Sequence, residues 1–440
     1  MADYIEPRIL KGFRDFLPAS EIARKNLLER LELSFRSYGF VPIDTPALEY
    51  AEILLGKGGG ETEKQIYRFK DHGDRDVALR FDLTVPFARF IAEHREELVF
   101  PFKRYHIGKV WRGENTQRGR YREFTQCDFD IVGNDTAASD FEIIHIMRNT
   151  LHTVSGGDVI IHMNHRGVFN RFLSRLDILD KTVDILRTVD KLAKIGRDAT
   201  LEALSELAGK EKAEKVLSFI GIAADFDETL KEVTAAVGPC PEVERLELLR
   251  KFMLDAGIAD SVVLDPSITR GLDYYTGVVF ESFIADLPDI GSICSGGRYD
   301  NLVGLYTPDK KFAESLKGVG TSIGVDRLVA ALETLGRLDD KKSYAETAIA
   351  WISNGSGGLC QALAEKLRKE SFPCEVLLEE EKLTKQFQTA EKKGIRWLII
   401  PDKEKPLDGA LTLRDLLKRE NTEGLTLEGV IKLLKDHPAR

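Results

Sequence analysis

The sequence predicts an α+β protein in which helices flank an antiparallel sheet. Residues 77–133 have mainly the alternation of strands, residues 166–259 have the 3.6-residue spacing of helices, and strand and helix patterns alternate after the charged stretch that ends near residue 344. We therefore expect a main domain at residues 1–165 and 260–337, a helical insertion at 166–259 and a small α/β domain at 345–440.

The composition is that of a folded protein with more than one domain. The 440 residues exceed the usual size of a single core, and 43% hydrophobic with 31% charged residues excludes extensive disorder. No apolar run approaches the ~20 residues needed to cross a bilayer, and the first ten residues lack the apolar stretch of a secretory signal. We therefore expect a cytosolic protein without a membrane partner.

Charge and cysteine content exclude two further classes. A net charge of −9 argues against non-specific coating of nucleic acid, which relies on a broad excess of lysine and arginine, but it allows a local basic groove. The five cysteines are widely spaced, with no C-x-x-C pair and no histidine at zinc-finger spacing. Neither a disulfide framework nor a structural zinc site is expected.

The first predicted element is an amphipathic helix from Ser20 to Tyr38, where apolar residues recur at helical spacing. Gly39 follows at the position where a left-handed residue caps a helix. Residues 40–46 then form a short extended segment, and its two prolines restrict it to a sheet edge or an interface. An ordinary edge strand is the alternative.

Residues 77–133 are expected to contain a long antiparallel strand pair, with a helix-like piece from Val85 to His94. Arg112 and Glu114 share a face near the end of the first strand. The second strand is polar on one face, which carries Phe124, Gln126, Asp128 and Asp130, and apolar on the other. An arginine, a glutamate and an aromatic ring can grip a phosphate, read an amine and stack a base. A solvated hairpin with paired charges is the alternative.

Two further runs combine glycine with charged or aromatic residues. Residues 269–277 place Arg270 beside a glycine and contain Tyr274 and Tyr275, which cannot both face a core from one strand. An aromatic edge strand is the alternative. Residues 295–300 contain a glycine pair followed by an arginine and a tyrosine, and a simple turn is the alternative.

The run from Gly318 to Gly324 precedes a helix with Arg327 in its first turn. Its spacing, G-x-G-x-x-x-G, is neither the dinucleotide fingerprint nor a P-loop, which disfavours a Rossmann or Walker site. An arginine at a helix start opposes the helix dipole, an arrangement that favours a bound anion. The glycines at 58–60 predict a flexible loop.

The last domain is expected to alternate strands and helices. The candidate strands are 347–352, 374–378 and 397–400, and the candidate helices are 359–370 and 382–393.

Taken together, these runs resemble the class II aminoacyl-tRNA synthetases. The helix that ends at Gly39, with Pro46 and Glu49 after it, is similar to motif 1 of that class. Arg112 and Glu114 with residues 122–124 are similar to motif 2, and Gly324 with Arg327 to motif 3. The runs at 270–275 and 296–300 are similar to the two signatures of the histidyl-tRNA synthetase family. The resemblance covers essentially the whole chain and implies that the last domain binds an anticodon.

The resemblance implies that the protein ligates L-histidine to tRNA(His) through a histidyl-adenylate, with ATP and Mg²⁺ as the substrate complex, without zinc, and as a homodimer with motif 1 at the interface. Arg112 would hold the α-phosphate, Glu114 the adenine amino group, Phe124 the adenine face and Arg327 the γ-phosphate. Arg112 and Arg270 would be the catalytic residues, since they stabilise charge on the phosphoryl oxygens.

The same resemblance implies a histidine site in which Asp82 meets the ammonium group. Its residues would be Asp82, Thr84, Gln126, Asp130, Arg270, Tyr274, Tyr275 and Tyr299. Asp82 and Asp130 stand where many bacterial members have glutamate, so each carboxylate is one methylene shorter here. Arg118 and Arg120 would contact the acceptor end of tRNA, and Lys385 the anticodon stem, although a solvated helix face is an alternative for Lys385.

Two rival functions remain, and only the first belongs to another class. The first is a histidine-sensing regulatory subunit of ATP phosphoribosyltransferase, which would lack the last domain and the intact histidine signatures. The second is a synthetase for threonine or proline, which the tyrosine pair at 274–275 disfavours.

Overall fold

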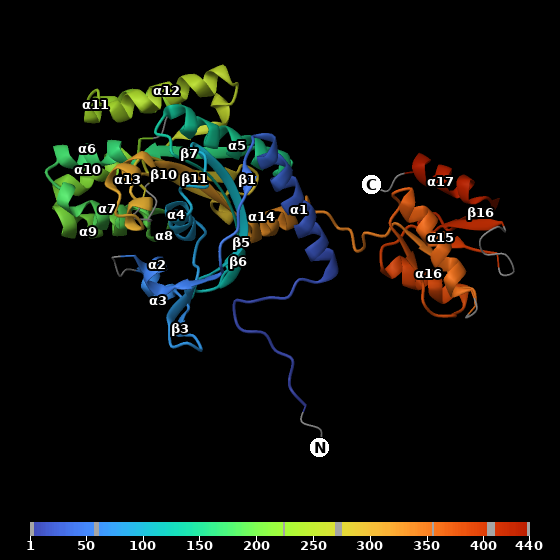
Figure 1. Ribbon diagram of the computed structural model, residues 1–440. Coiled ribbons are helices and arrows are strands. Elements are labelled where there is room, and N and C mark those ends of the chain that lie inside the picture. The colour runs from blue at the N-terminus through green and yellow to red at the C-terminus, as the bar shows by residue number, and fades with distance from the viewer. Residues whose placement is uncertain are drawn as a thin grey trace. The chain divides into compact units, whose positions relative to one another are not determined.

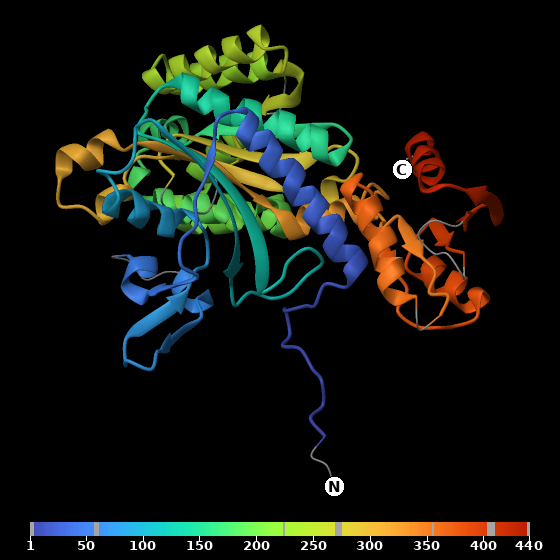
Figure 2. The same ribbon diagram turned by 45° about the vertical axis from the view of Figure 1, so that its right-hand side comes forward.

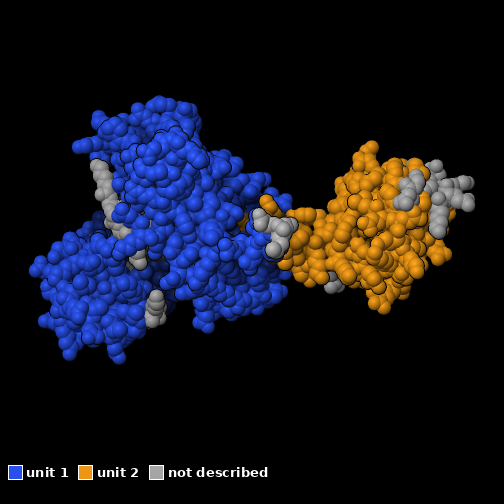
Figure 3. Space-filling model, turned by 90° about the horizontal axis from the view of Figure 1, so that it is seen from below, with its two compact units in different colours: residues 1–14, 28–338 blue, residues 15–27, 339–440 orange. Residues whose placement is uncertain are grey.

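The structure is a computed structural model of the chain. It describes residues 4–56, 61–222, 225–268, 275–353, 356–402 and 410–437. The chain forms two compact units, one of residues 1–14 and 28–338 and the other of residues 15–27 and 339–440 (Figure 3). Within the described ranges, no helix is both long and apolar enough to span a membrane.

An eight-stranded sheet forms the centre of the larger unit (Figure 1). In spatial order its strands are β1 (Val41–Pro42), β5 (Phe102–Trp111), β6 (Glu123–Val132), β11 (Gly318–Gly324), β10 (Cys294–Tyr299), β9 (Val278–Ile284), β7 (Val159–His165) and β8 (Val262–Leu264). The six central strands pair antiparallel with one another. The edge strands β1 and β8 each pair in parallel, with β5 and β7 respectively. The long antiparallel pair predicted within residues 77–133 is confirmed as β5 and β6.

Helices flank this sheet, as the sequence predicts. They are α1 (Pro18–Ser37), α4 (Thr84–Glu93), α5 (Ala137–Ser155), α13 (Lys310–Ser315) and α14 (Val325–Thr334). Phe35 of α1 packs on Phe129 of β6, with 4.8 Å between ring centroids. Gly39 takes a φ of +78° directly after α1, which confirms the predicted left-handed cap. The chain then enters the edge strand β1.

A buried ion pair joins α5 to the sheet. Arg298 of β10, 2% exposed, donates two hydrogen bonds to Oδ1 of Asp140, at 2.9 and 2.7 Å. For residues 295–300 the sequence leaves a simple turn as the alternative to a ligand-binding run. Most of this segment is in fact strand β10, and Arg298 joins the sheet to α5 rather than facing a ligand.

Two smaller groups of elements adjoin the sheet. Strands β2 (Leu48–Tyr50), β4 (Asp76–Leu79) and β3 (Arg68–Lys70) form a three-stranded sheet with α2 (Ala51–Leu55) and α3 (Glu61–Gln65) beside it. The helices between residues 166 and 255 gather at the other side of the unit (Figures 1 and 2). They are α6 (Arg166–Arg175), α7 (Thr182–Val189), α8 (Leu192–Ile195), α9 (Arg197–Ala208), α10 (Lys210–Ile220), α11 (Phe226–Val237) and α12 (Pro241–Asp255), as the helical periodicity predicts. The predicted loop at residues 58–60 lies outside the described residues.

The second unit contains a five-stranded sheet. Its order is β13 (Cys374–Val376), β12 (Thr347–Ile349), β14 (Trp397–Ile400), β15 (Leu411–Asp415) and β16 (Glu420–Leu425), with helices α15 (Gly357–Lys369), α16 (Leu383–Lys392) and α17 (Leu427–Asp436). The three strands and two helices expected from the sequence are present, although two strands are shorter than predicted. The sequence does not predict β15, β16 and α17.

Candidate active site

Polar residues of β5 and β6 lie on the same face of the large sheet as very small residues of β11. In the observed register, Gly320 is opposite Asp130, Ser322 is opposite Asp128, and Gly324 is opposite Gln126. Directly opposite residues of antiparallel strands share a face. The polar face predicted for β6 is therefore bordered by residues with little or no side chain, which leaves room above the sheet.

Each carboxylate oxygen of Asp130 on this face lies close to one other side chain. Its Oδ1 accepts a 2.6 Å hydrogen bond from the hydroxyl of Tyr299, and its Oδ2 lies 2.8 Å from Nη2 of Arg104. A Cβ added at Gly320 would lie 1.9 Å from Oδ1 of Asp130, and one added at Gly318 would lie 2.6 Å from the ring of Tyr299. Glycine is therefore required at both positions, because any side chain would displace the acid or the tyrosine.

Burial governs the electrostatics of this group. Arg104, Asp130 and Tyr299 are each at most 2% exposed. Burial raises the pKa of Asp130, whereas the charge of Arg104 and the hydrogen bond from Tyr299 oppose that rise. A carboxylate without water depends on such partners to stay ionised. The arrangement is therefore suited to accepting a proton-bearing group of a ligand.

Asp82 is a second buried carboxylate, next to the first turn of α4. Its Oδ1 accepts a 3.1 Å hydrogen bond from the backbone N–H of Val85, and its Oδ2 is buried without a hydrogen-bond partner among the described residues. Burial raises the pKa of Asp82 to about 6, while the backbone hydrogen bond and the nearby Arg112 and Arg104 oppose the rise. An unpartnered acceptor of this kind suits an ammonium group.

Two further side chains predicted for the amino-acid site also lie on buried positions. The Oε1 of Gln126 is buried without a hydrogen-bond partner in the described part of the chain. Tyr275 is 7% exposed, and a Cβ added at Gly297 would lie 2.9 Å from its Cδ1. Thr84 begins α4 and is half-buried.

A second group of predicted residues lies around the loop that joins β5 to β6. The guanidinium of Arg112 lies 5.2 Å from the ring centroid of Phe124, and its Nη1 lies 4.0 Å from Oε1 of Glu114. The Nε of Arg112 donates a 2.9 Å hydrogen bond to the carbonyl of Phe81, which fixes the side chain's direction. The structure thus brings the three together.

Arg327 lies in the first turn of α14, as predicted. Its Nη1 donates a 2.5 Å hydrogen bond to the carbonyl of Ser292. The β5–β6 loop reaches this turn, since a Cβ added at Gly119 would lie 3.4 Å from Cγ of Arg327. Arginines at the two ends of such a site can hold a chain of phosphates.

Other predicted residues are placed differently. Arg270 and Tyr274 lie outside the described residues. Arg118 donates a 2.8 Å hydrogen bond to Oγ1 of Thr334, and Nη1 of Arg120 lies 3.6 Å from Glu114. Lys385 of the second unit pairs with Glu381 on an exposed helix face.

Sequence reasoning missed Arg104 and the two glycines that make room for the site. Arg104 is opposite Asp130 in the register of β5 and β6. Its only signal in the sequence is a charge within an otherwise mixed strand, and the register that gives this charge a meaning comes from strand pairing.

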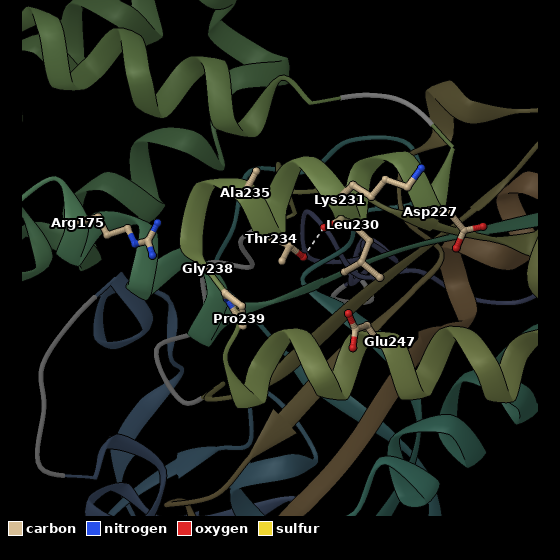
Figure 4. A pocket seen from close by; sticks show the side chains of 9 residues that line it. All are labelled: Arg175, Asp227, Leu230, Lys231, Thr234, Ala235, Gly238, Pro239 and Glu247. Carbon is tan, nitrogen blue, oxygen red and sulfur yellow. Dashed lines mark hydrogen bonds between the residues drawn. The ribbon is translucent and has the colours of Figure 1, made fainter.

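The described residues also contain an open pocket of about 720 Å³ between helices α6, α11 and α12 (Figure 4). It is lined by side chains of α11 and α12 and by Arg175 of α6. None of the residues predicted from the sequence for catalysis or binding lines it.

The positions of the two groups define the class of protein. An arginine at the end of the long strand pair and a second one on the helix after β11 have the chemistry to hold a nucleotide's phosphates across an antiparallel sheet. A parallel doubly wound sheet instead binds its nucleotide at the carboxyl ends of its strands. The class II aminoacyl-tRNA synthetases have the former arrangement.

Comparisons with known proteins define the family. The family model described as histidyl-tRNA synthetase matches residues 12–328, and a model described as an anticodon binding domain matches residues 346–437. The histidine--tRNA ligase of Treponema denticola is 50% identical over 98% of this chain and 99% of its own length, and that of Rhodopirellula baltica is 44% identical over 95% of each. The crystal structure of histidyl-tRNA synthetase from Nostoc sp. PCC 7120 matches with a TM-score of 0.86 at 31% identity, covering 98% of this chain and all of that one. The chain therefore belongs to the histidyl-tRNA synthetase family, which confirms the resemblance and the fold class inferred from the sequence.

Asp128 gives this site a pH dependence that can be measured. It is 2% exposed, and its Oδ1 is buried without a hydrogen-bond partner among the described residues. Burial raises the pKa of Asp128 to about 7; Arg104 opposes the rise and Asp130 adds to it. In the unfolded chain an aspartate ionises near pH 3.9. The folded state therefore holds the extra proton between about pH 4 and pH 7, and stability falls as the pH rises through that window.

We accordingly predict that Asp128→Asn removes this fall. As the pH rises from 5 to 8, the free energy of unfolding of the variant should increase relative to that of the original chain, by about 1.4 kcal/mol for each pH unit over which only the folded original chain holds the proton. Urea unfolding at several pH values measures this difference, with exposed Asp289→Asn as the control. A constant difference between the two variants across this pH range would contradict the raised pKa of Asp128.

Proposed function

We propose that the chain ligates L-histidine to tRNA(His) in two steps at the site described above. In the first step, an oxygen of the histidine carboxylate attacks the α-phosphorus of ATP, the bond to the bridging oxygen breaks, and pyrophosphate leaves with its electron pair. The histidine carboxylate is ionised at neutral pH, so no general base is needed. Alignment and charge stabilisation supply the catalysis.

The observation that carries the choice of histidine is the Asp130 carboxylate held between Tyr299 and Arg104. A buried, oriented carboxylate can accept a further hydrogen bond, so it favours a ligand that brings an N–H group over one of the same shape that lacks it. In this proposal Asp130 and Gln126 contact the imidazole. Asp82 meets the ammonium group with its unpartnered Oδ2, since an ammonium would satisfy that oxygen.

The ATP side of the proposal uses the second group. Arg112 holds the α-phosphate and steadies the charge that develops there, Phe124 stacks on adenine, Glu114 reads the adenine amine, and Arg327 holds the γ-phosphate. Mg²⁺ enters with ATP as part of the substrate complex. Arg270, the second catalytic arginine of the proposal, rests on the sequence alone.

In the second step, the terminal ribose hydroxyl of tRNA attacks the carbonyl carbon of the adenylate. The hydroxyl proton is released, and AMP leaves with the electron pair of the broken C–O bond. We assign residues 345–440 to the anticodon and the β5–β6 loop, with Arg118 and Arg120, to the acceptor end. The match of residues 346–437 to an anticodon-binding model supports a tRNA partner and disfavours a purely sensing role. Such an enzyme works in the cytosol.

Pyrophosphate exchange without tRNA tests the function. The purified chain should exchange labelled pyrophosphate into ATP with histidine and with none of the other nineteen amino acids. Arg112→Met should lower this exchange about 10²-fold or more, because it removes a charge aimed at the reacting phosphate. The surface variant Arg171→Met should leave it unchanged, since its ion pair with Glu242 is solvent-exposed.

Exchange with another amino acid would contradict the assignment of histidine. Histidine binding without any exchange would instead favour the sensing role.

We also propose that the chain acts as a homodimer through the edge of the large sheet. Val41 of the edge strand β1 is 46% exposed, Leu33 of α1 is 57% exposed, and Tyr50 of β2, an edge strand of the three-stranded sheet, is 50% exposed. Apolar side chains at an unpaired strand edge are usually covered by a partner.

Light scattering should give twice the 49.4 kDa of one chain. Val41→Glu should shift the population towards the monomer, because it places a charge in the proposed interface. Leu248→Glu on α12, where the leucine is 41% exposed, is the matched control and should have no effect. A monomer in the original chain, or an unaltered dimer in Val41→Glu, would contradict this interface.

A further inference from the structure

An N-terminal segment, residues 11–14, packs against the base of the β5–β6 loop. The carbonyl of Gly12 accepts a 2.9 Å hydrogen bond from the backbone N–H of Arg122. Gly12 has a φ of +88°, and a Cβ added there would lie 2.7 Å from Cγ of Arg122, so the approach depends on glycine. The ring of Phe13 meets that of Tyr67 edge-on, with 6.4 Å between centroids.

Arg14 links this segment to two elements of the ATP site. Its guanidinium lies 4.0 Å from the ring centroid of Tyr121, on the returning limb of the loop. It also forms an ion pair with Asp326, which directly precedes Arg327 in α14. The side chain of Asp326 is only 3% exposed, so removing one of its partners would leave a buried polar group unsatisfied.

Asp326 also contacts β6. Its Oδ2 accepts a 2.6 Å hydrogen bond from the backbone N–H of Thr125. Thr125 stands between Phe124 and Gln126 in β6. One carboxylate thus fixes the strand that carries the adenine-stacking ring to the helix that carries Arg327.

We propose that Arg14 is a positioning residue for ATP, which acts through Asp326 by holding Phe124 and Arg327 in register. This inference rests on the proposed function, because it takes from it the nucleotide contacts of those two residues. Arg14 itself touches no substrate. Its guanidinium can serve both partners at once, since it bonds Asp326 through its edge and stacks on Tyr121 through its face.

The proposal predicts different effects on the binding of ATP and of histidine. The histidine group is held by different contacts, those of Asp130 with Arg104 and Tyr299. Loosening Asp326 should therefore displace the nucleotide contacts and leave the amino-acid contacts in place. Small displacements of positioning groups have large kinetic effects, up to about 10²-fold for 1 Å.

Pyrophosphate exchange by the full chain tests the proposal. In Arg14→Met, the KM for ATP should rise about tenfold, within the range expected for displaced positioning groups, while the KM for histidine stays within about twofold. Arg14→Lys should restore part of the loss, because lysine keeps the charge but cannot also stack as a planar group. Asp326→Asn should produce the same ATP-specific change. Arg8→Met, which changes an exposed arginine shortly before this segment, is the matched control and should behave like the original chain.

Thermal unfolding of each variant, measured alongside, distinguishes positioning from loss of the fold. An unchanged KM for ATP in both Arg14→Met and Asp326→Asn would overturn the proposal, as would an equal rise for both substrates together with a lowered midpoint. The original chain is the internal reference: if it shows no exchange with histidine, the proposed function fails, whereas normal exchange in both the original chain and Arg14→Met counts against the positioning role alone.

Discussion

A carboxylate that has lost its water must be surrounded by compensating groups, and Asp130 sets this requirement for the whole of the proposed amino-acid site. Arg104 and Tyr299 provide the compensation from β5 and β10, at 2.8 and 2.6 Å. Gly320 and Gly318 of β11 provide the space. Four strands of the sheet therefore have to pair in one register for this single acid to remain buried and oriented.

In the proposed function, the same sheet separates recognition of the amino acid from recognition of the nucleotide. Asp130 lies deep along β6, whereas Phe124 lies near its start, beside the loop that carries Arg112. Asp326 joins that start to α14 through the backbone of Thr125. In this proposal each substrate has its own supporting contacts, although Asp130 and Phe124 lie on one strand. Rigid strands hold such groups more precisely than loops do.

Local patterns predicted the elements and the polar face of β6, because alternation along a strand is a property of neighbouring residues. They could not give Arg104 or Gly320 a role, since both acquire it through pairing with β6. The contact of Arg14 with Asp326 joins residues 312 positions apart and leaves no local signal. Strand β16 was missed because its sequence, ENTEGL, lacks apolar alternation and is almost wholly exposed.

If the charge on Asp130 selects histidine, calorimetric titration of Asp130→Asn should show it. The substitution keeps the shape of the side chain and removes its charge. We expect the Kd for histidine to rise about 10²-fold or more while the Kd for ATP stays within about twofold, with near-ultraviolet circular dichroism confirming a native fold. Histidine affinity retained in a folded Asp130→Asn variant would contradict this role of the charge.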